Sequence, residues 1–305
     1  MTSGPTPDQS ALILVSYGNQ GIAERADGLQ VDCLYRRSVG RPLCGDRVTL
    51  EATDDDSWVV NSIKARDNIF VRADRQQRQQ PVASNLDRVL IVIAPQPAPS
   101  KDLVERYLVA VHSLGIRPLL VINKMELLNA NDRAELAPFC RLDAYRSLGY
   151  EVVEVSCKLE PGVRPLEPYL NGATSILVGQ SGVGKSSLAN QLIPDLDLQT
   201  GGLSGSTGKG THTTTTTIMY SLPRETTGGG RLVDSPGVWE YGLWSLGAAE
   251  LASGFPEFES LVHNCRFNDC KHHGEPGCAV AAAVETGEVL AWRYASYLRL
   301  LQQSG

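Results

Sequence analysis

The stretch ATSILVGQSGVGKSSLANQLI (residues 173–193) joins an apolar run, a glycine-rich turn and a helix-compatible segment. The apolar run predicts a buried strand, and SSLANQLI predicts the helix that follows it. Between them, Gly179–Ser186 fits the pattern GxxxxGK[ST], whose glycines let backbone N–H groups surround phosphates at a helix N-terminus. The stretch therefore predicts a strand, loop and helix that bind the phosphates of a nucleotide.

A second phosphate-binding element follows about 50 residues later. Lys185 is placed to reach the β- and γ-phosphates and Ser186 to ligate Mg²⁺. Asp234-Ser-Pro-Gly237 follows the strand RLV, so we expect Asp234 in the Mg²⁺ shell and the Gly237 N–H on the γ-phosphate. The predicted phosphate-binding residues are Gly179, Gln180, Ser181, Gly182, Val183, Gly184, Lys185, Ser186, Ser187, Asp234 and Gly237.

The sequence around these elements has the pattern typical of a parallel sheet. LDRVLIVIA, RPLLVINK, YEVVEVS and RLVDSPG are further apolar, β-branched runs, and helix-compatible stretches follow several of them. Continuous apolar strands that alternate with helices indicate a parallel sheet with crossover helices. We therefore expect an α/β domain over residues 81–240.

Two elements at strand ends point to guanine as the bound base. Asn123-Lys124-Met-Glu126 ends one strand, and Ser156-Cys157-Lys158 ends the next. They resemble the NKxD and SAK elements with which GTPases select guanine. An acidic side chain at position 126 accepts from guanine N1–H and the 2-amino group, which adenine lacks, and the Cys157 N–H is placed to meet the guanine carbonyl.

The N-terminal region predicts a small barrel. ALILVSYGNQGIAER, LQVDCLYR, GDRVTLEA, SWVVNSIKAR and NIFVRAD are short β-like runs separated by turns. Five strand candidates in so short a segment favour an OB-type β-barrel over residues 11–80, after a disordered tail at 1–10. The polar tract RQQRQQPVA (75–83) predicts a linker.

A Cys/His cluster lies in the C-terminal region, residues 241–305, which is otherwise predicted to be helical with a break at Thr286–Gly287. The three thiols are Cys265, Cys270 and Cys278, and the candidate imidazoles are His263, His272 and His273. Three thiolates and one imidazole form a closed tetrahedral set typical of structural zinc. Cys33, Cys44 and Cys140 are interpreted as ordinary small apolar residues.

The order of the nucleotide elements is permuted. Ordinary GTPases run from phosphate loop through DxxG to NKxD and SAK, whereas here residues 123–126 and 156–158 precede the loop at 179. With the OB-like region, the loop GTHTTT, DSPGVWEYGLW and CRFNDCKHHGEPGC, the chain resembles the RsgA (YjeQ) family of circularly permuted, ribosome-dependent GTPases over residues 11–300. The family usually has Asp where this chain has Glu126.

This resemblance implies an activity and a partner. The implied activity is GTP hydrolysis stimulated by the small ribosomal subunit during its late maturation, with contacts to its rRNA. The family spacing selects His272 as the fourth ligand of one structural Zn²⁺ per chain.

The switch loop lacks a glutamine that would orient the attacking water, because Val238 follows DSPG. His212, in Gly210-Thr-His-Thr-Thr-Thr, is the best candidate for this role, and the resemblance supports it. Thr213 or Thr214 is expected as a second Mg²⁺ ligand.

Composition limits the partners. The net charge of −6 excludes a polycation, so RNA contact depends on local basic patches, which a solvated basic face would equally explain. The longest apolar runs are too short to span a membrane, and seven cysteines without a secretory signal favour the cytoplasm. We expect a monomer. The basic residues in question are Arg36, Arg37, Arg41, Arg47, Lys64, Arg66, Arg72, Arg75 and Arg78.

Two other functions remain open from the sequence. One is an RNA-clamping protein whose nucleotide site gates affinity with little turnover. The other is a permuted GTPase acting on the large ribosomal subunit, which the zinc cluster and the OB-like region disfavour.

Overall fold

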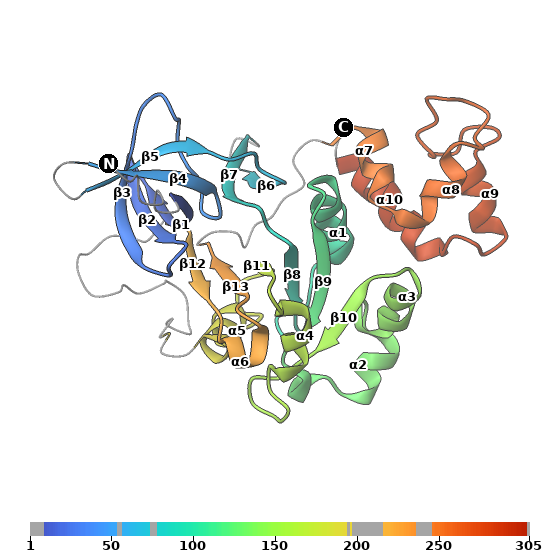
Figure 1. The fold of residues 1–305 in the computed structure, drawn as a ribbon. Coiled ribbons are helices and arrows are strands. Elements are labelled where there is room, and N and C mark those ends of the chain that lie inside the picture. The colour runs from blue at the N-terminus through green and yellow to red at the C-terminus, as the bar shows by residue number, and fades with distance from the viewer. Residues whose placement is uncertain are drawn as a thin grey trace.

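The computed structural model describes residues 9–53, 57–73, 78–193, 196, 216–235 and 246–303. A β-barrel, a β-hairpin, a mostly parallel sheet with flanking helices and a helical C-terminal unit follow one another along the chain (Figure 1). Among the described residues, no helix is both long and apolar enough to cross a membrane.

The central sheet is parallel except at one edge. Its predicted apolar runs all form strands, and the added edge strand β12 is antiparallel to β13. Strand β8 is buried along nearly its whole length, which explains its continuous run RVLIVI. In spatial order the strands are β10 (Glu151–Glu154), β9 (Arg117–Ile122), β8 (Arg88–Ile93), β11 (Thr174–Val178), β13 (Arg231–Asp234) and β12 (Ile218–Ser221).

Helices cover both faces of this sheet because side chains alternate along each strand. On β8, Val89 and Ile91 share a core with α1 (Leu103–Ser113), whereas Leu90 and Val92 share one with α5 (Lys185–Leu192). The other helical segments of this region are η1 (Met125–Leu127), α2 (Ala130–Glu135), η2 (Phe139–Arg141), α3 (Leu142–Ser147), η3 (Arg164–Leu166), α4 (Glu167–Leu170) and α6 (Arg224–Thr227).

The segment 130–149 follows β9, and its sequence predicts a helix-compatible stretch. It forms two short α-helices, α2 and α3, in place of one continuous helix. α2 ends at Glu135 and α3 begins at Leu142, with Pro138 between them. Proline has no backbone N–H to donate and clashes with the preceding turn, so the helix cannot continue through it. We expected Cys33, Cys44 and Cys140 to be small apolar residues of the interior. Cys33 and Cys44 are buried, but Cys140 is exposed.

The N-terminal strands close into a barrel of OB type. The strand order is β1-β2-β3-β5-β4, and β4 pairs back onto β1. Its interior is apolar and contains buried residues such as Ile13, Val48 and Val60. The strands are β1 (Ser10–Tyr17), β2 (Gln20–Arg25), β3 (Gln30–Tyr35), β4 (Arg47–Ala52) and β5 (Trp58–Ile63).

Two sequence expectations for this region are wrong in detail. The first predicted run, residues 11–25, is two strands joined by a turn at Gly18, whose φ of 57° suits glycine. The last run forms β6 (Ile69–Ala73) outside the barrel, where it pairs with β7 (Gln79–Ser84) from the predicted linker. Backbone hydrogen bonds build this hairpin, so the glutamine-rich strand needs no apolar alternation. Of the predicted tail, residues 1–8 lie outside the described residues, and Ser10 already belongs to β1.

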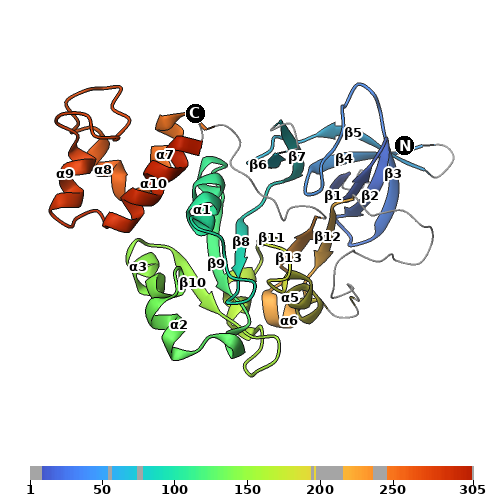
Figure 2. The same cartoon turned by 180° about the vertical axis from the view of Figure 1, so that it is seen from behind.

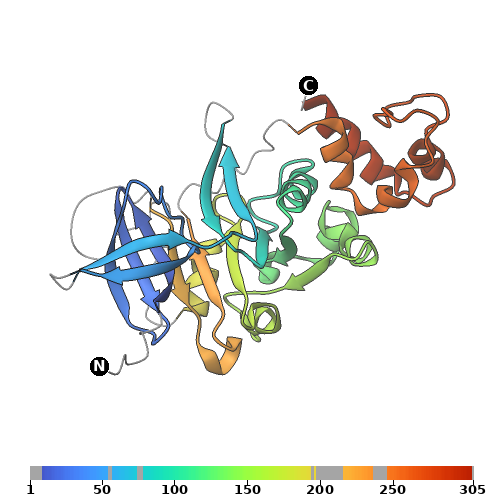
Figure 3. The same ribbon diagram turned by 45° about the horizontal axis from the view of Figure 1, so that its top comes forward.

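The barrel and the sheet are joined edge to edge. β1 pairs antiparallel with β12 through Val15 and Ile218, and the hairpin β6–β7 lies between the barrel and α1 (Figure 3). The C-terminal helices pack on the opposite side of α1 (Figure 2), where Tyr107, Leu251 and Leu300 belong to one core. These segments are α7 (Ala248–Ser253), η5 (Pro256–Phe258), α8 (Glu259–Val262), α9 (Ala279–Glu285) and α10 (Ala291–Gln303), with the expected break at Thr286–Gly287.

Candidate nucleotide site and metal centre

The predicted nucleotide elements converge on one edge of the sheet. The NKME element follows β9, the SCK element follows β10, the phosphate loop follows β11, and Asp234 ends β13. These strands are parallel, so their carboxyl ends meet at the same edge. The fold thus brings together segments that lie up to 111 residues apart, from Asn123 to Asp234.

The phosphate loop needs its glycines for steric reasons. At Gly179 φ is 142°, and a Cβ there would lie 2.2 Å from the carbonyl oxygen of Val92. At Gly184 φ is 99°, and a Cβ would lie 2.3 Å from the side-chain amide of Asn123. The loop therefore packs directly against the strand end and against the base-binding element. Of the other loop residues, Val183 is buried, Gln180, Ser186 and Ser187 are half-buried, and Ser181 and Gly182 are exposed.

Lys185 begins α5 and its ammonium group lies inside the loop. It donates to the carbonyl oxygens of Gly179 and Gln180, at 2.7 Å each. Burial lowers the pKa of Lys185 to about 8, and the carboxylate of Asp234 opposes that shift. Burial likewise raises the pKa of Asp234, which nearby Lys185 counteracts. A half-buried cation on α5 and a half-buried carboxylate at the end of β13 thus lie close enough to influence each other.

The NKME element braces the phosphate loop. The amide of Asn123 is buried and donates to the carbonyl oxygen of Val183 at 2.9 Å. Lys124 has φ 58° and donates to the carbonyl oxygens of Gly182 at 2.6 Å and Gln96 at 2.8 Å. The Gln96 contact was not predicted from sequence, because a backbone acceptor leaves no signal in residue type.

Glu126 is held by the SCK element. Ser156 donates to its carboxylate at 2.7 Å and accepts from the backbone N–H groups of Lys158 and Leu159 at 3.0 Å. The ammonium of Lys158 lies 4.0 Å from the same carboxylate. Gln191 of α5 donates to the carbonyl oxygen of Cys157 at 2.8 Å, which ties this element to the phosphate unit. The acidic acceptor is therefore fixed on both sides.

Four predicted site residues lie outside the described residues. They are His212, Thr213, Thr214 and Gly237.

The donor set that is described fits Mg²⁺ chemically. A hydroxyl from Ser186 and a carboxylate from Asp234 are hard oxygen ligands of the kind that Mg²⁺ prefers. Ser186 is the second residue of α5, and Asp234 is the last residue of the neighbouring strand β13.

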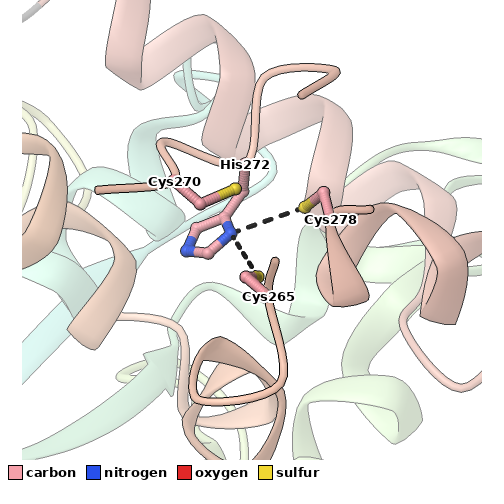
Figure 4. Close-up of side chains that lie close together, drawn as sticks. All are labelled: Cys265, Cys270, His272 and Cys278. Carbon is pink, nitrogen blue, oxygen red and sulfur yellow. Dashed lines mark hydrogen bonds between the residues drawn. The ribbon is translucent and has the colours of Figure 1, made fainter. Parts of the chain in front are cut away.

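The Cys/His cluster assembles as the sequence predicts (Figure 4). Ligand atoms of Cys265, Cys270, His272 and Cys278 all lie within 4.8 Å of one another. The Sγ atoms of Cys265 and Cys278 are each 3.5 Å from Nδ1 of His272. Tetrahedral zinc with Zn–S near 2.3 Å and Zn–N near 2.0–2.1 Å requires an S···N separation of about 3.6 Å. The rival imidazoles, His263 and His273, are exposed and are not part of the group.

Hydrogen bonds hold the metal loop in place. The hydroxyls of Tyr294 and Tyr297 in α10 donate to the carbonyl oxygens of His272 and Lys271, at 2.8 and 2.7 Å. Glu275 accepts from two backbone N–H groups of the loop. Cys278 caps α9 and accepts from the Ala281 N–H at 3.4 Å.

Three of the predicted basic residues have acidic partners. Arg36 pairs with Glu51, Arg47 with Asp67, and Arg66 with the buried Asp46. Arg75 lies outside the described residues. The surface of the barrel is therefore less cationic than the arginine count suggests.

Comparison with known proteins agrees with this geometry. The model of the RsgA GTPase family matches residues 63–244. The small ribosomal subunit biogenesis GTPase RsgA of Hahella chejuensis is 42% identical over 297 residues, which cover 96% of this chain and 84% of that protein. The protein of the same name from Azotobacter vinelandii is also 42% identical, over 299 residues, which cover 97% of this chain and 85% of that protein.

Solved structures show the same arrangement. YjeQ from Thermotoga maritima superposes with a TM-score of 0.80 at 29% identity, covering 97% of this chain and 98% of that one. YloQ, described as a circularly permuted GTPase, gives 0.76 at 26% identity, covering 100% and 97%. These matches account for the permuted order of the nucleotide elements, for the barrel and for the Cys/His cluster. This chain belongs to the RsgA GTPase family.

Proposed function

We propose that this protein is a GTPase that binds the small ribosomal subunit and hydrolyses GTP to assist late maturation of that subunit. The convergence of the NKME element, the SCK element, the phosphate loop and Asp234 on one sheet edge carries the GTPase part. Membership of the RsgA family and the names of its relatives support the ribosomal part.

Guanine recognition depends on the carboxylate of Glu126, which Ser156 holds in place. Glu126 accepts from guanine N1–H and the 2-amino group, while Ser156 holds its second oxygen. The backbone N–H of Cys157 is the donor for the guanine carbonyl. Asn123 and Lys124 act by holding the base-binding element against the phosphate loop.

Phosphate binding uses the loop and Lys185. The backbone N–H groups of residues 179–187 and the ammonium of Lys185 compensate the phosphate charge, including the charge that develops on the leaving group as its bond to the transferring group breaks. Mg²⁺, when bound, would neutralise phosphate oxygens, and we propose Ser186, Asp234 and either Thr213 or Thr214 as its ligands.

The attacking water requires a basic or orienting group. We assign this role to His212, since neither Val238 nor another aliphatic side chain can accept a proton. Lys185→Ala or Ser186→Ala then abolishes turnover, whereas His212→Ala slows hydrolysis and leaves nucleotide binding nearly intact.

For the C-terminal cluster we propose one structural Zn²⁺ per chain. The S···N distances of 3.5 Å support this metal, and we propose Nδ1 of His272 as the coordinating nitrogen. A closed Cys₃His set leaves no position for substrate, so the ion stabilises the loop that α10 supports.

The proposed partner is the rRNA of the small subunit, contacted by a monomer in the cytoplasm. Basic side chains of the barrel would meet phosphates, so the affinity for the subunit should fall steeply with salt. Affinity should be higher with a GTP analogue than with GDP, because the γ-phosphate orders switch segments in GTPases.

A GTPase assay with purified small subunits, purified large subunits and neither tests the proposal. We expect slow hydrolysis alone, strong stimulation by small subunits and none by large subunits. Tight subunit binding without stimulated turnover would support an RNA clamp instead. Equal rates in all three reactions would refute the ribosomal assignment.

A further inference from the structure

A cavity of about 390 Å³ lies where the barrel, the hairpin β6–β7 and the nucleotide-binding sheet meet. Residues from the barrel (Ser16, Arg41, Arg66), the hairpin (Arg72) and the sheet (Thr217, Ser235) line it. Figure 3 shows the three units that surround this junction. The volume falls within the range of small-ligand sites in proteins.

The cationic lining is held in place by the fold. Arg66 makes two hydrogen bonds to Asp46, both at 2.7 Å, and Asp46 is completely buried. Asp46 also accepts from Ser84 at 2.6 Å and from the Leu43 N–H at 2.7 Å. This network orients the guanidinium group of Arg66 before any ligand arrives. Arg41 and Arg72 also line this cavity, and Arg72 donates to Gln80 at 3.5 Å.

The rest of the polar lining consists of neutral donors. Thr217 and Ser235 are hydrogen-bonded to each other at 3.0 Å on the sheet side. None of the described lining residues is acidic. Guanidinium groups with neighbouring hydroxyls are the donor set that recognises phosphate oxygens.

We propose that this cavity binds a phosphate group. The site is separate from the nucleotide loop: a free phosphorylated ligand goes beyond the proposed function, whereas an RNA phosphate would name one contact of the proposed rRNA partner and rests on that proposal. The phosphate belongs either to the backbone of a bound RNA strand or to a free phosphorylated molecule, since both present the same oxygens.

The position of this cavity allows a phosphate bound there to affect nucleotide binding. Ser235 directly follows Asp234, and Thr217 directly precedes β12, which pairs with both β13 and β1. A phosphate held between Arg41 or Arg72 and these two hydroxyls therefore contacts both sides of the junction. If a bound phosphate favours one arrangement of the strand ends, it changes the affinity for nucleotide. Bound nucleotide then changes the affinity for phosphate by the same factor.

The test uses the full-length protein saturated with GDP, so that the nucleotide loop is occupied. Equilibrium dialysis with radiolabelled pyrophosphate should show one saturable site per chain. Arg41→Gln and Arg72→Gln should each weaken binding at least tenfold, because each removes a charge-assisted hydrogen bond. Arg117→Gln, an exposed change on β9 that does not line the cavity, should alter it less than twofold.

A second arm identifies the source of the phosphate. Binding of a fluorescent single-stranded 12-nucleotide RNA that falls in Arg41→Gln and is competed by pyrophosphate indicates the RNA backbone. Pyrophosphate binding that the RNA does not compete indicates a free ligand. Equal losses for Arg117→Gln and Arg41→Gln, or pyrophosphate binding insensitive to Arg41 and Arg72, would overturn the site.

These outcomes are independent of GTP hydrolysis. Failure of the cavity would leave stimulated turnover unchanged, whereas failure of the proposed function would appear only in the subunit assay. Circular dichroism melts of each variant check that it is folded, and Arg41→Gln alters only an exposed side chain.

Discussion

At the scale of single residues, Glu126 is where the chain departs from the aspartate usual in its family. Ser156 donates to one oxygen of its carboxylate, and the ammonium of Lys158 lies 4.0 Å from the other oxygen. The hydrogen bond from Ser156 limits rotation of the carboxylate, so the longer side chain still presents a positioned acceptor.

We predict guanine selectivity that depends on this carboxylate. GDP should bind about 5- to 150-fold more tightly than ADP, since an unpaired buried polar group costs about 1–3 kcal/mol. Glu126→Ala should remove most of this ratio, and Ser156→Ala should reduce it by releasing the carboxylate. Titrations with both nucleotides in Mg²⁺ measure the ratio. Glu160→Ala, an exposed change nearby, is the control, and equal GDP and ADP affinities in the wild type would contradict the assignment of the base site.

Lys185 gives a prediction about pH. Its pKa is lowered to about 8 by burial in the protein alone, while an unfolded lysine keeps a pKa near 10.4. The charged form therefore costs stability below pH 8, and this cost decreases as pH rises from about 8 to 10. Nucleotide phosphates restore the ammonium, so GDP binding should take up protons at pH 8.5 and lose affinity above pH 8.

Calorimetric titration of GDP in two buffers with different ionisation enthalpies measures this uptake. We expect more uptake at pH 8.5 than at pH 7.5. Lys185→Gln should abolish the difference wherever GDP binding remains measurable. No dependence of uptake on pH in the wild type would show that Lys185 keeps its charge in the protein alone.

At the scale of elements, the metal loop is short, polar and exposed for much of its length, so its position depends on a few strong contacts. The cluster supplies one and the tyrosine hydroxyls of α10 supply another. Structural zinc contributes about 10–16 kcal/mol to the folding of small finger peptides. The loop and the start of α9 should therefore depend on the metal.

We predict one zinc per chain, lost in Cys278→Ser and in His272→Asn. Metal analysis gives the stoichiometry, and hydrogen exchange should show faster exchange over residues 264–281 in both variants. His273→Asn and Cys140→Ser, which change an exposed imidazole and an exposed thiol, should leave both measurements unchanged. A zinc-free protein with full protection in this loop would argue against the site.

At the scale of the whole molecule, buried ionic contacts lock the C-terminal helices to α1. Arg293 of α10 is fully buried, makes hydrogen bonds of 2.6 and 3.1 Å to Glu257, and lies 3.9 Å from Glu105 of α1. Arg299 of α10 donates twice to Asp102, the residue before α1, at 2.6 and 2.7 Å. The C-terminal unit is therefore attached to the nucleotide-binding domain itself and lies away from the barrel (Figures 1 and 2).

Breaking the buried contact should loosen both sides of this interface together. Arg293→Met leaves two buried carboxylates without their cation, a change that costs about 3–5 kcal/mol, or roughly 10²–10⁴-fold in an opening equilibrium. Hydrogen exchange should accelerate by such a factor in α1 and α10 but not in the barrel. Arg266→Gln, an exposed change in the same unit, is the control. Acceleration confined to α10 would mean that Arg293 stabilises only its own helix.

From the sequence we could predict the parallel strands of the sheet, the phosphate loop and the clustering of Cys and His residues, and the family resemblance selected His272. Each of these depends on residues close in sequence: apolar runs long enough to be buried, glycines at fixed spacing, and Cys and His within 14 residues. The permuted order of the nucleotide elements was also readable, because order is a property of the sequence. These local signals were enough to indicate the family.

How the distant parts of the chain meet could be seen only once the chain was folded. The pairing of β6 with the polar strand β7, the contact of Lys124 with the Gln96 carbonyl and the attachment of Arg293 to two distant carboxylates depend on backbone groups or on partners far along the chain. Such contacts leave no periodic pattern. The phosphate cavity is the clearest case, because its arginines look like an ordinary basic surface until the fold gathers them around one space.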